Sequence, residues 1–116
     1  MKQVIAKVYA GFSPAHGACR LAVEDVGTAA LDTDMPWLFL EDDILRIAWE
    51  GIYFPLDEAL QALYACLPPE AEGKLDYLDL EAWTLTRHVL LPGAKAADRF
   101  SIATRSLNHV LAYSGH

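Results

Sequence analysis

Metal coordination is the first chemistry to consider, because the sequence contains four histidines and two cysteines. His16 and Cys19 stand three positions apart, a spacing at which a loop can turn both side chains toward one ion. Structural zinc sites normally combine two such local pairs, whereas Cys66 and the other histidines are scattered singly. We therefore expect no metal, and interpret the two cysteines as small buried hydrophobic residues with free thiols. A single disulfide between them is the alternative.

Carboxylates are concentrated in two short segments that could offer oxygen ligands to calcium or magnesium. Asp32-Thr33-Asp34 copies the start of a calcium-binding loop, but the glycine and glutamate that such loops place later are missing. Glu41 and Asp42-Asp43 follow an apolar run and precede another, and a hairpin turn explains this arrangement. The sequence therefore predicts neither a bound cation nor a cofactor.

Catalysis has no recognisable motif in this chain. The sequence lacks a G-x-S-x-G segment, a catalytic-cysteine signature and a glycine loop suited to phosphate. The most suggestive polar residues are Thr84, Thr86 and His88, which follow Trp83 and would point the same way along a strand. These residues could line a pocket between a sheet and its helices, or they could form the solvent face of an edge strand.

Aromatic residues crowd into one stretch of the chain, namely Trp37, Phe39, Trp49, Tyr53 and Phe54. Large aromatic side chains are enriched at protein–protein interfaces. Binding of single-stranded nucleic acid would require basic residues interleaved among them, and this stretch has few. We therefore expect some of these five residues to contact a protein partner and the others to lie in the core.

The charge of the chain restricts its partners. Sixteen acidic residues outnumber nine basic ones, which gives a net charge of −7. Nucleic acids and acidic membrane surfaces are bound by surplus Lys and Arg, so neither is an expected partner. The one locally basic group consists of Arg99, Arg105 and His109. It could contact an acidic partner, or it could be an ordinary solvated helix face.

Length and hydropathy indicate a single globular domain over residues 1–116. A chain of this size buries enough surface to fold without a metal. The segment 1–12 faintly resembles a signal peptide, but Lys7 interrupts it and no convincing cleavage site follows. The sequence contains no run of 18 apolar residues, so it predicts no transmembrane helix and a cytoplasmic location.

Strands are predicted mainly in the first half of the chain. Alternation of apolar and polar residues over 2–12 and again over 19–24 predicts two paired strands. The segment 27–36 reads as a loop. Apolar runs at 37–41 and 44–50, separated by two aspartates, predict a β-hairpin.

Helices and one long strand are predicted in the second half. Leucines spaced by three and four predict a helix over 57–67, which Pro68-Pro69 ends. The cluster Trp83-Thr84-Leu85-Thr86 favours a strand over 75–91, although a helical stripe also fits that segment. A regular apolar stripe predicts a second helix over 96–113.

These elements predict an α+β domain in which an antiparallel sheet of about four or five strands carries two amphipathic helices on one face. The other face would stay partly open, and a composition that is 53% hydrophobic exceeds what one small core readily buries. We therefore predict a non-enzymatic interaction or accessory domain, acting as a homodimer or with another protein. The alternative is a small-molecule-binding or catalytic domain with the pocket described above.

Overall fold

The computed structural model describes residues 4–30, 36–92 and 100–108. Eight helices and strands follow one another along these residues: β1 (Ala6–Ser13), α1 (Gly17–Ala30), β2 (Leu38–Glu41), β3 (Ile44–Gly51), α2 (Leu56–Cys66), β4 (Glu72–Asp79), β5 (Thr84–Leu90) and β6 (Phe100–Ser106). The strands form one antiparallel sheet in the order β2-β3-β1-β4-β5-β6.

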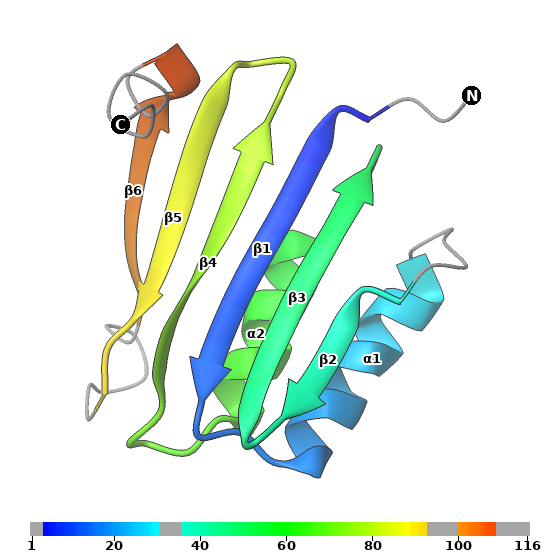
Figure 1. Cartoon of the computed structure of the whole chain (residues 1–116), viewed down its shortest axis with the longest axis vertical. Coiled ribbons are helices and arrows are strands. Elements are labelled where there is room, and N and C mark those ends of the chain that lie inside the picture. The colour runs from blue at the N-terminus through cyan, green and yellow to red at the C-terminus, as the bar shows by residue number, and fades with distance from the viewer. Residues whose placement is uncertain (1–3, 31–35, 93–99, 109–116) are drawn as a thin grey trace.

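Both helices cover the same face of this sheet. In Figure 1 they lie behind the strands, and α1 also packs against α2 and the edge strand β2. No described helix covers the face that Figure 1 turns toward the viewer. No helix among the described residues is both long enough and apolar enough to cross a membrane.

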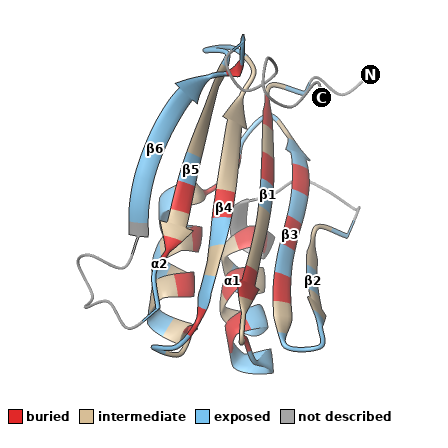
Figure 2. Ribbon diagram, turned by 60° about the vertical axis from the view of Figure 1, so that its left-hand side comes forward, coloured by how far each residue is buried: buried red, intermediate tan, exposed pale blue. Residues whose placement is uncertain are grey.

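The core lies between the helices and the covered face of the sheet. Successive side chains of a strand point to opposite faces, so every second residue is buried. On β1 these residues include Val8 and Phe12, and on β3 they include Leu45 and Ile47. Figure 2 shows this alternation of buried and exposed positions along β3. The buried face of α2, represented by Leu63, closes the core from the other side.

The hairpin and the first predicted helix are confirmed. Asp42 and Asp43, with φ angles of 51° and 63°, make the turn between β2 and β3. Aspartate tolerates this left-handed conformation better than most residues do. Helix α2 occupies 56–66, follows Pro55 and carries Asp57 in its first turn, where the helix dipole favours negative charge.

The strand predicted over 19–24 is wrong, because these residues belong to α1. The apparent alternation came from Cys19, Leu21 and Val23, but Leu21 is 61% exposed while the other two are buried. Cys19, Val23 and Gly27 are spaced by four residues and all face the core, as the helical period requires. Local alternation over so few residues could not distinguish the two structures.

Two further segments differ from the prediction. Residues 75–91 are extended as expected, but they form β4 and β5 with a turn at 80–83, instead of one long strand. The helix predicted over 96–113 is wrong across 100–106, where β6 pairs with β5, and 96–99 and 109–113 lie outside the described residues. Pairing with a neighbouring strand overrides the local helical stripe.

The predicted fold class is confirmed at the level of an α+β chain with one antiparallel sheet and two helices on one face. The sheet has six strands where about four or five were expected. The difference comes from β6 and from the division of 75–91 into two strands, while α1 replaces an expected strand.

A disulfide joins the two helices. Cys19 of α1 and Cys66 of α2 are bonded, with their Cα atoms 5.1 Å apart and a separation of 47 positions in the sequence. The expectation of free thiols is therefore wrong, and the disulfide alternative holds. Disulfides persist mainly in oxidising compartments, and the cytoplasmic location stays a prediction.

Replacing Gly27 by alanine tests the packing of α1 against the sheet. A Cβ atom at Gly27 would collide with the indole ring of Trp37. Alanine should raise helix propensity by about 1 kcal/mol, but the overpacking should cost about 1–3 kcal/mol, so we expect a net loss. Urea unfolding measures the difference. Gly17→Ala is the control, because a Cβ atom there meets nothing within 4 Å. A Gly27→Ala protein as stable as the wild type would contradict this packing.

Removing the disulfide should destabilise the protein. By loop-closure entropy, a cross-link spanning 47 residues is worth about 4 kcal/mol. We expect the double variant Cys19→Ala, Cys66→Ala to lose a stability of this order, and reduction of the wild type with dithiothreitol to have a similar effect. The measurement is the unfolding midpoint together with a count of titratable thiols. Two reactive thiols in the unreduced protein would show that the bond does not form.

Candidate functional site

The candidate site is the face of the sheet opposite the helices, which we call the open face. Strand pairing aligns its side chains in three rows that cross the strands, each named after its residue on β1. The Lys7 row contains Glu50, Lys7, Leu78, Leu85 and Arg105. The Tyr9 row contains Ala48, Tyr9, Asp76, Arg87 and Ala103. The Gly11 row contains Phe39, Arg46, Gly11, Lys74, Val89 and Ser101.

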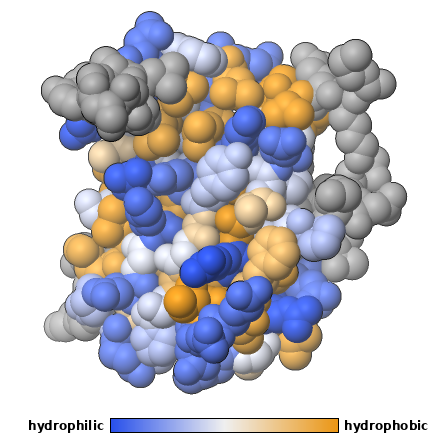
Figure 3. Space-filling model, in the orientation of Figure 1, coloured by the Kyte–Doolittle hydropathy of each residue, from blue (hydrophilic) through white to orange (hydrophobic). Residues whose placement is uncertain are grey.

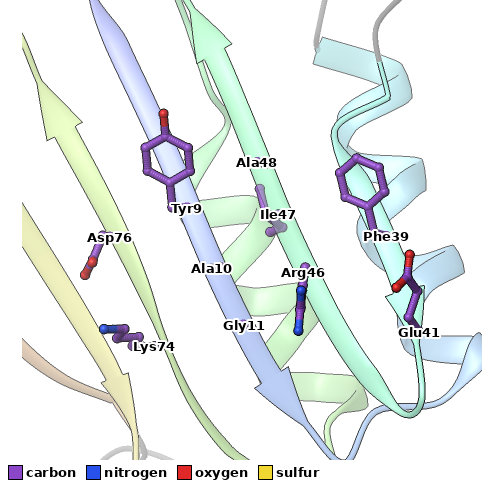
Figure 4. Close-up of a pocket in the computed structure, with 10 residues that line it drawn as sticks. All are labelled: Tyr9, Ala10, Gly11, Phe39, Glu41, Arg46, Ile47, Ala48, Lys74 and Asp76. Carbon is purple, nitrogen blue, oxygen red and sulfur yellow. The ribbon is translucent and has the colours of Figure 1, made fainter.

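A hollow of about 490 Å³ is centred on the Gly11 row. Gly11 has no side chain to fill it, and a Cβ atom there would meet nothing within 4 Å. Arg46 on β3 and Lys74 on β4 lie on either side of Gly11, as Figure 4 shows. With one strand between them, their backbones are about 10 Å apart. The hollow is therefore wide enough to admit a side chain from another molecule.

Two ion pairs fix part of the open face. Arg87 donates from Nε to Oδ1 of Asp76 at 2.8 Å and from Nη2 to Oδ2 at 3.0 Å, a bidentate contact that raises the pKa of the arginine. Lys7 Nζ lies 3.7 Å from Oε2 of Glu50. These pairs hold charged side chains in place on the Lys7 and Tyr9 rows.

Arg46 and Lys74 form no ion pair with any described residue. Figure 4 shows both side chains bordering the hollow, together with the carboxylates of Glu41 and Asp76. Since Asp76 is already bound to Arg87, the hollow offers two basic groups and one further acid to an incoming molecule. It can therefore accept either sign of charge.

The open face is nearly balanced in charge although the chain is acidic. Five of the nine basic residues project from it: Lys7, Arg46, Lys74, Arg87 and Arg105. Four of the sixteen acidic residues accompany them: Glu41, Glu50, Glu72 and Asp76. The rest of the chain, with four basic and twelve acidic residues, therefore carries the whole of the acidic excess.

Apolar groups are interspersed with these charges. Tyr9 is 43% exposed and Phe39 is 37% exposed, while Leu78, Leu85 and Val89 are partly buried. Figure 3 views the open face and shows hydrophobic and hydrophilic side chains side by side across it. Such a mixture is typical of the interfaces of proteins that associate.

The five aromatic residues predicted to bind a partner are divided between the two faces. Trp37 and Trp49 pack against Phe54, with ring centroids 6.1 Å and 5.3 Å from it, next to the core. Phe39 lies on the open face, and Tyr53, which is 58% exposed, follows the end of β3. Of the predicted group, Phe39 is the residue that the structure brings to the hollow.

The residues of the predicted pocket lie on β5 and the turn before it. Trp83 occupies the turn with a φ of 58°, and its indole Nε1 donates to Oδ1 of Asn108 at 2.8 Å. The hydroxyls of Thr86 and Thr104 are 3.0 Å apart. Thr84, Thr86 and His88 alternate toward the helix side, away from the hollow, which lies on the opposite face.

His88 is the one buried polar side chain in the described part of the chain. Both ring nitrogens lack a hydrogen-bond partner there. Burial lowers the pKa of His88 from its ordinary value, and the negative charges of Asp57 and Asp76 oppose this effect only in part. The imidazole is therefore held in its neutral form.

The remaining candidate residues are not brought together. Cys19 is bonded to Cys66 and does not join His16. Within the described ranges, no three His, Cys, Asp or Glu side chains gather as ligands for one metal ion. Asp32, Asp34, Arg99 and His109 lie outside those ranges, and Arg105 stands on the open face.

Gly11, Arg46 and Lys74, the residues that define the hollow, were not predicted from the sequence as site residues. The sequence does contain a signal for Gly11, because the alternation along β1 places Lys7, Tyr9 and Gly11 on one face. The positions of Arg46 and Lys74 depend on which strands flank β1, and local sequence does not specify that pairing.

Comparison of the chain with protein-family models, with curated proteins and with solved structures finds no match. The open face is therefore interpreted from its own geometry and charge.

Acid should destabilise the protein through His88. Because its folded pKa is lowered, the stability it contributes is complete above the unfolded pKa of about 6.5 and is lost as the pH falls toward the folded pKa. We expect His88→Leu to be less sensitive to a change from pH 7.5 to pH 5 than the wild type. Urea unfolding at both pH values tests this, with His16→Gln as the exposed control. An unchanged pH dependence in His88→Leu would contradict it.

Proposed function

We propose that the chain is a non-enzymatic association domain that forms a homodimer through its open face. The observation that carries this proposal is the open face itself, a broad sheet surface with mixed apolar and charged residues that no described helix covers. Monomeric proteins rarely expose large apolar surface, and association in two-fold symmetry is the commonest way to bury it.

The size of the face supports a stable interface. The sheet lies in the plane of the two longer dimensions of the molecule, which measure 34 Å and 31 Å. Full overlap of two such faces would bury on the order of 1,000 Å² per partner, against about 800 Å² per partner in a standard interface. Overlap of most of the face would therefore give an interface of standard size.

The charge of the open face favours a second copy of the chain as the molecule that binds there. Two chains of net charge −7 repel each other in most orientations. On the open face, five basic residues accompany four acidic ones, so two copies can meet there without a net repulsion. The Glu24 and Asp57 regions of the helices lie on the acidic remainder and are less suited to self-association.

This proposal moves the centre of the expected interface. From the sequence it was expected among the five aromatic residues of 37–54, but Trp49 of that group is 7% exposed and belongs to the core. The hairpin contributes Phe39, Arg46 and Ala48 to the open face, and β1 and β4 contribute the residues next to them.

A charge placed at the centre of the open face should dissociate the dimer. Ala48 is exposed in the Tyr9 row, and Ala48→Glu would bury an unpaired carboxylate at the interface. Sedimentation velocity from about 1 to 100 μM should show a dimer for the wild type and a monomer for the variant. Leu21→Glu, on the exposed side of α1, is the control and should remain a dimer. A wild-type protein that stays monomeric at 100 μM would refute self-association.

A further inference from the structure

We infer that the two-fold axis of this dimer crosses the strands along the Tyr9 row, so that the Gly11 row of each protomer faces the Lys7 row of its partner. The inference rests on the proposed dimer and specifies its register. Its basis is that facing residues of the two rows are complementary in charge on β3, in size on β1 and β6, and in hydrophobicity on β5.

The geometry follows from the symmetry operation. Rotation by 180° about an axis that lies in the interface and crosses the strands reverses the direction along each strand and keeps the order of the strands. The rows are about 7 Å apart along the strands, so an axis on the Tyr9 row exchanges the rows on either side of it. Each residue of the Gly11 row then faces the residue of the Lys7 row on the same strand of the partner.

Charge complementarity is clearest on β3. Arg46 would face the partner's Glu50, and the two-fold axis generates this pair twice. Arg46 has no ion pair within the described residues, and Glu50 has one contact there, at 3.7 Å from Lys7. The dimer would supply an acidic partner for an arginine that lacks one in the monomer.

Size complementarity is clearest on β1 and β6. Gly11 would face the partner's Lys7, so the hollow above Gly11 would receive a long basic side chain. The carboxylate of Glu41 lines the same hollow and can accept from an incoming ammonium group. On β6, Ser101 would face the partner's Arg105, which again sets a small residue opposite a long one.

Hydrophobic contacts fall on the strands between these pairs. On β5, Val89 would face the partner's Leu85. On β4, the aliphatic stem of Lys74 would face the partner's Leu78, an arrangement that lets the ammonium group remain near the rim. Twisted sheets pack face to face with their strands about 30° apart, so these contacts are closest near the centre of the sheet.

The competing two-fold arrangement leaves the two charged residues of β3 without ion pairs across the interface. An axis parallel to the strands, between β1 and β4, would keep each row but exchange the strands on either side of it. Glu50 would then face the partner's Leu85, and Arg46 would face the partner's Val89. Both contacts bury a charged group against an apolar one, which costs free energy without an ion pair in return.

A charge-exchange experiment tests this register. Arg46→Glu and Glu50→Arg should each place like charges opposite one another twice per dimer, and each should raise the dimer dissociation constant at least about tenfold. The double variant Arg46→Glu, Glu50→Arg should recover the wild-type constant to within about threefold. An equimolar mixture of the two single variants should form a heterodimer of similar affinity, because both of its charge pairs are attractive. The dissociation constants come from sedimentation equilibrium.

A matched control lies on α1, where Arg20 and Glu24 form an ion pair with Nε and Oε2 3.8 Å apart on the helix side. Arg20→Glu and Glu24→Arg carry the same charge changes and should leave the dissociation constant unchanged. If the wild type dimerises but the Arg46 and Glu50 single variants dimerise equally well, or their mixture fails to recover, the axis is refuted while the proposed function stands. A monomeric wild type would refute both.

Discussion

The fold depends on the burial of one face of the central strands by the two helices. β1 lies in the middle of the sheet and contributes Val8 and Phe12 to the core, both almost fully buried. The helices are held over that face by their own apolar stripes and by the bond between Cys19 and Cys66. Because strand side chains alternate, the same burial directs Tyr9 and Gly11 to the opposite face.

That constraint makes the uncovered face the place to look for function. No described helix covers the other side of the sheet, which can therefore face water or another molecule. Here the uncovered side combines exposed Tyr9 and Phe39 with a nearly even number of acids and bases. We propose that this acidic chain, which repels copies of itself elsewhere, associates on this surface, and that the hollow at Gly11 then receives the partner's Lys7.

Local sequence predicted the elements that local chemistry controls. Two aspartates specify the hairpin turn, and flanking prolines delimit α2. Prediction from local sequence was wrong for α1 and for β6. Over 19–24, the exposed Leu21 stands between the buried Cys19 and Val23 and makes a helical segment look alternating. Over 100–106, pairing with β5 overrides a helical spacing. The alternation of Lys7, Tyr9 and Gly11 predicts that one face of β1 is exposed. Which residues of other strands lie beside them in the rows depends on the order of the strands in the sheet, which local sequence does not specify.

The most direct test of the account is hydroxyl-radical labelling of side chains at low and high protein concentration. If the open face is the dimer interface, oxidation of Tyr9 should fall as the protein passes from about 1 to 100 μM. Tyr53 is 58% exposed beyond the end of β3 and serves as an internal reference that should react equally at both concentrations. Equal oxidation of Tyr9 at both concentrations, in samples that sedimentation shows to be dimeric at the higher one, would contradict the account and place the interface elsewhere.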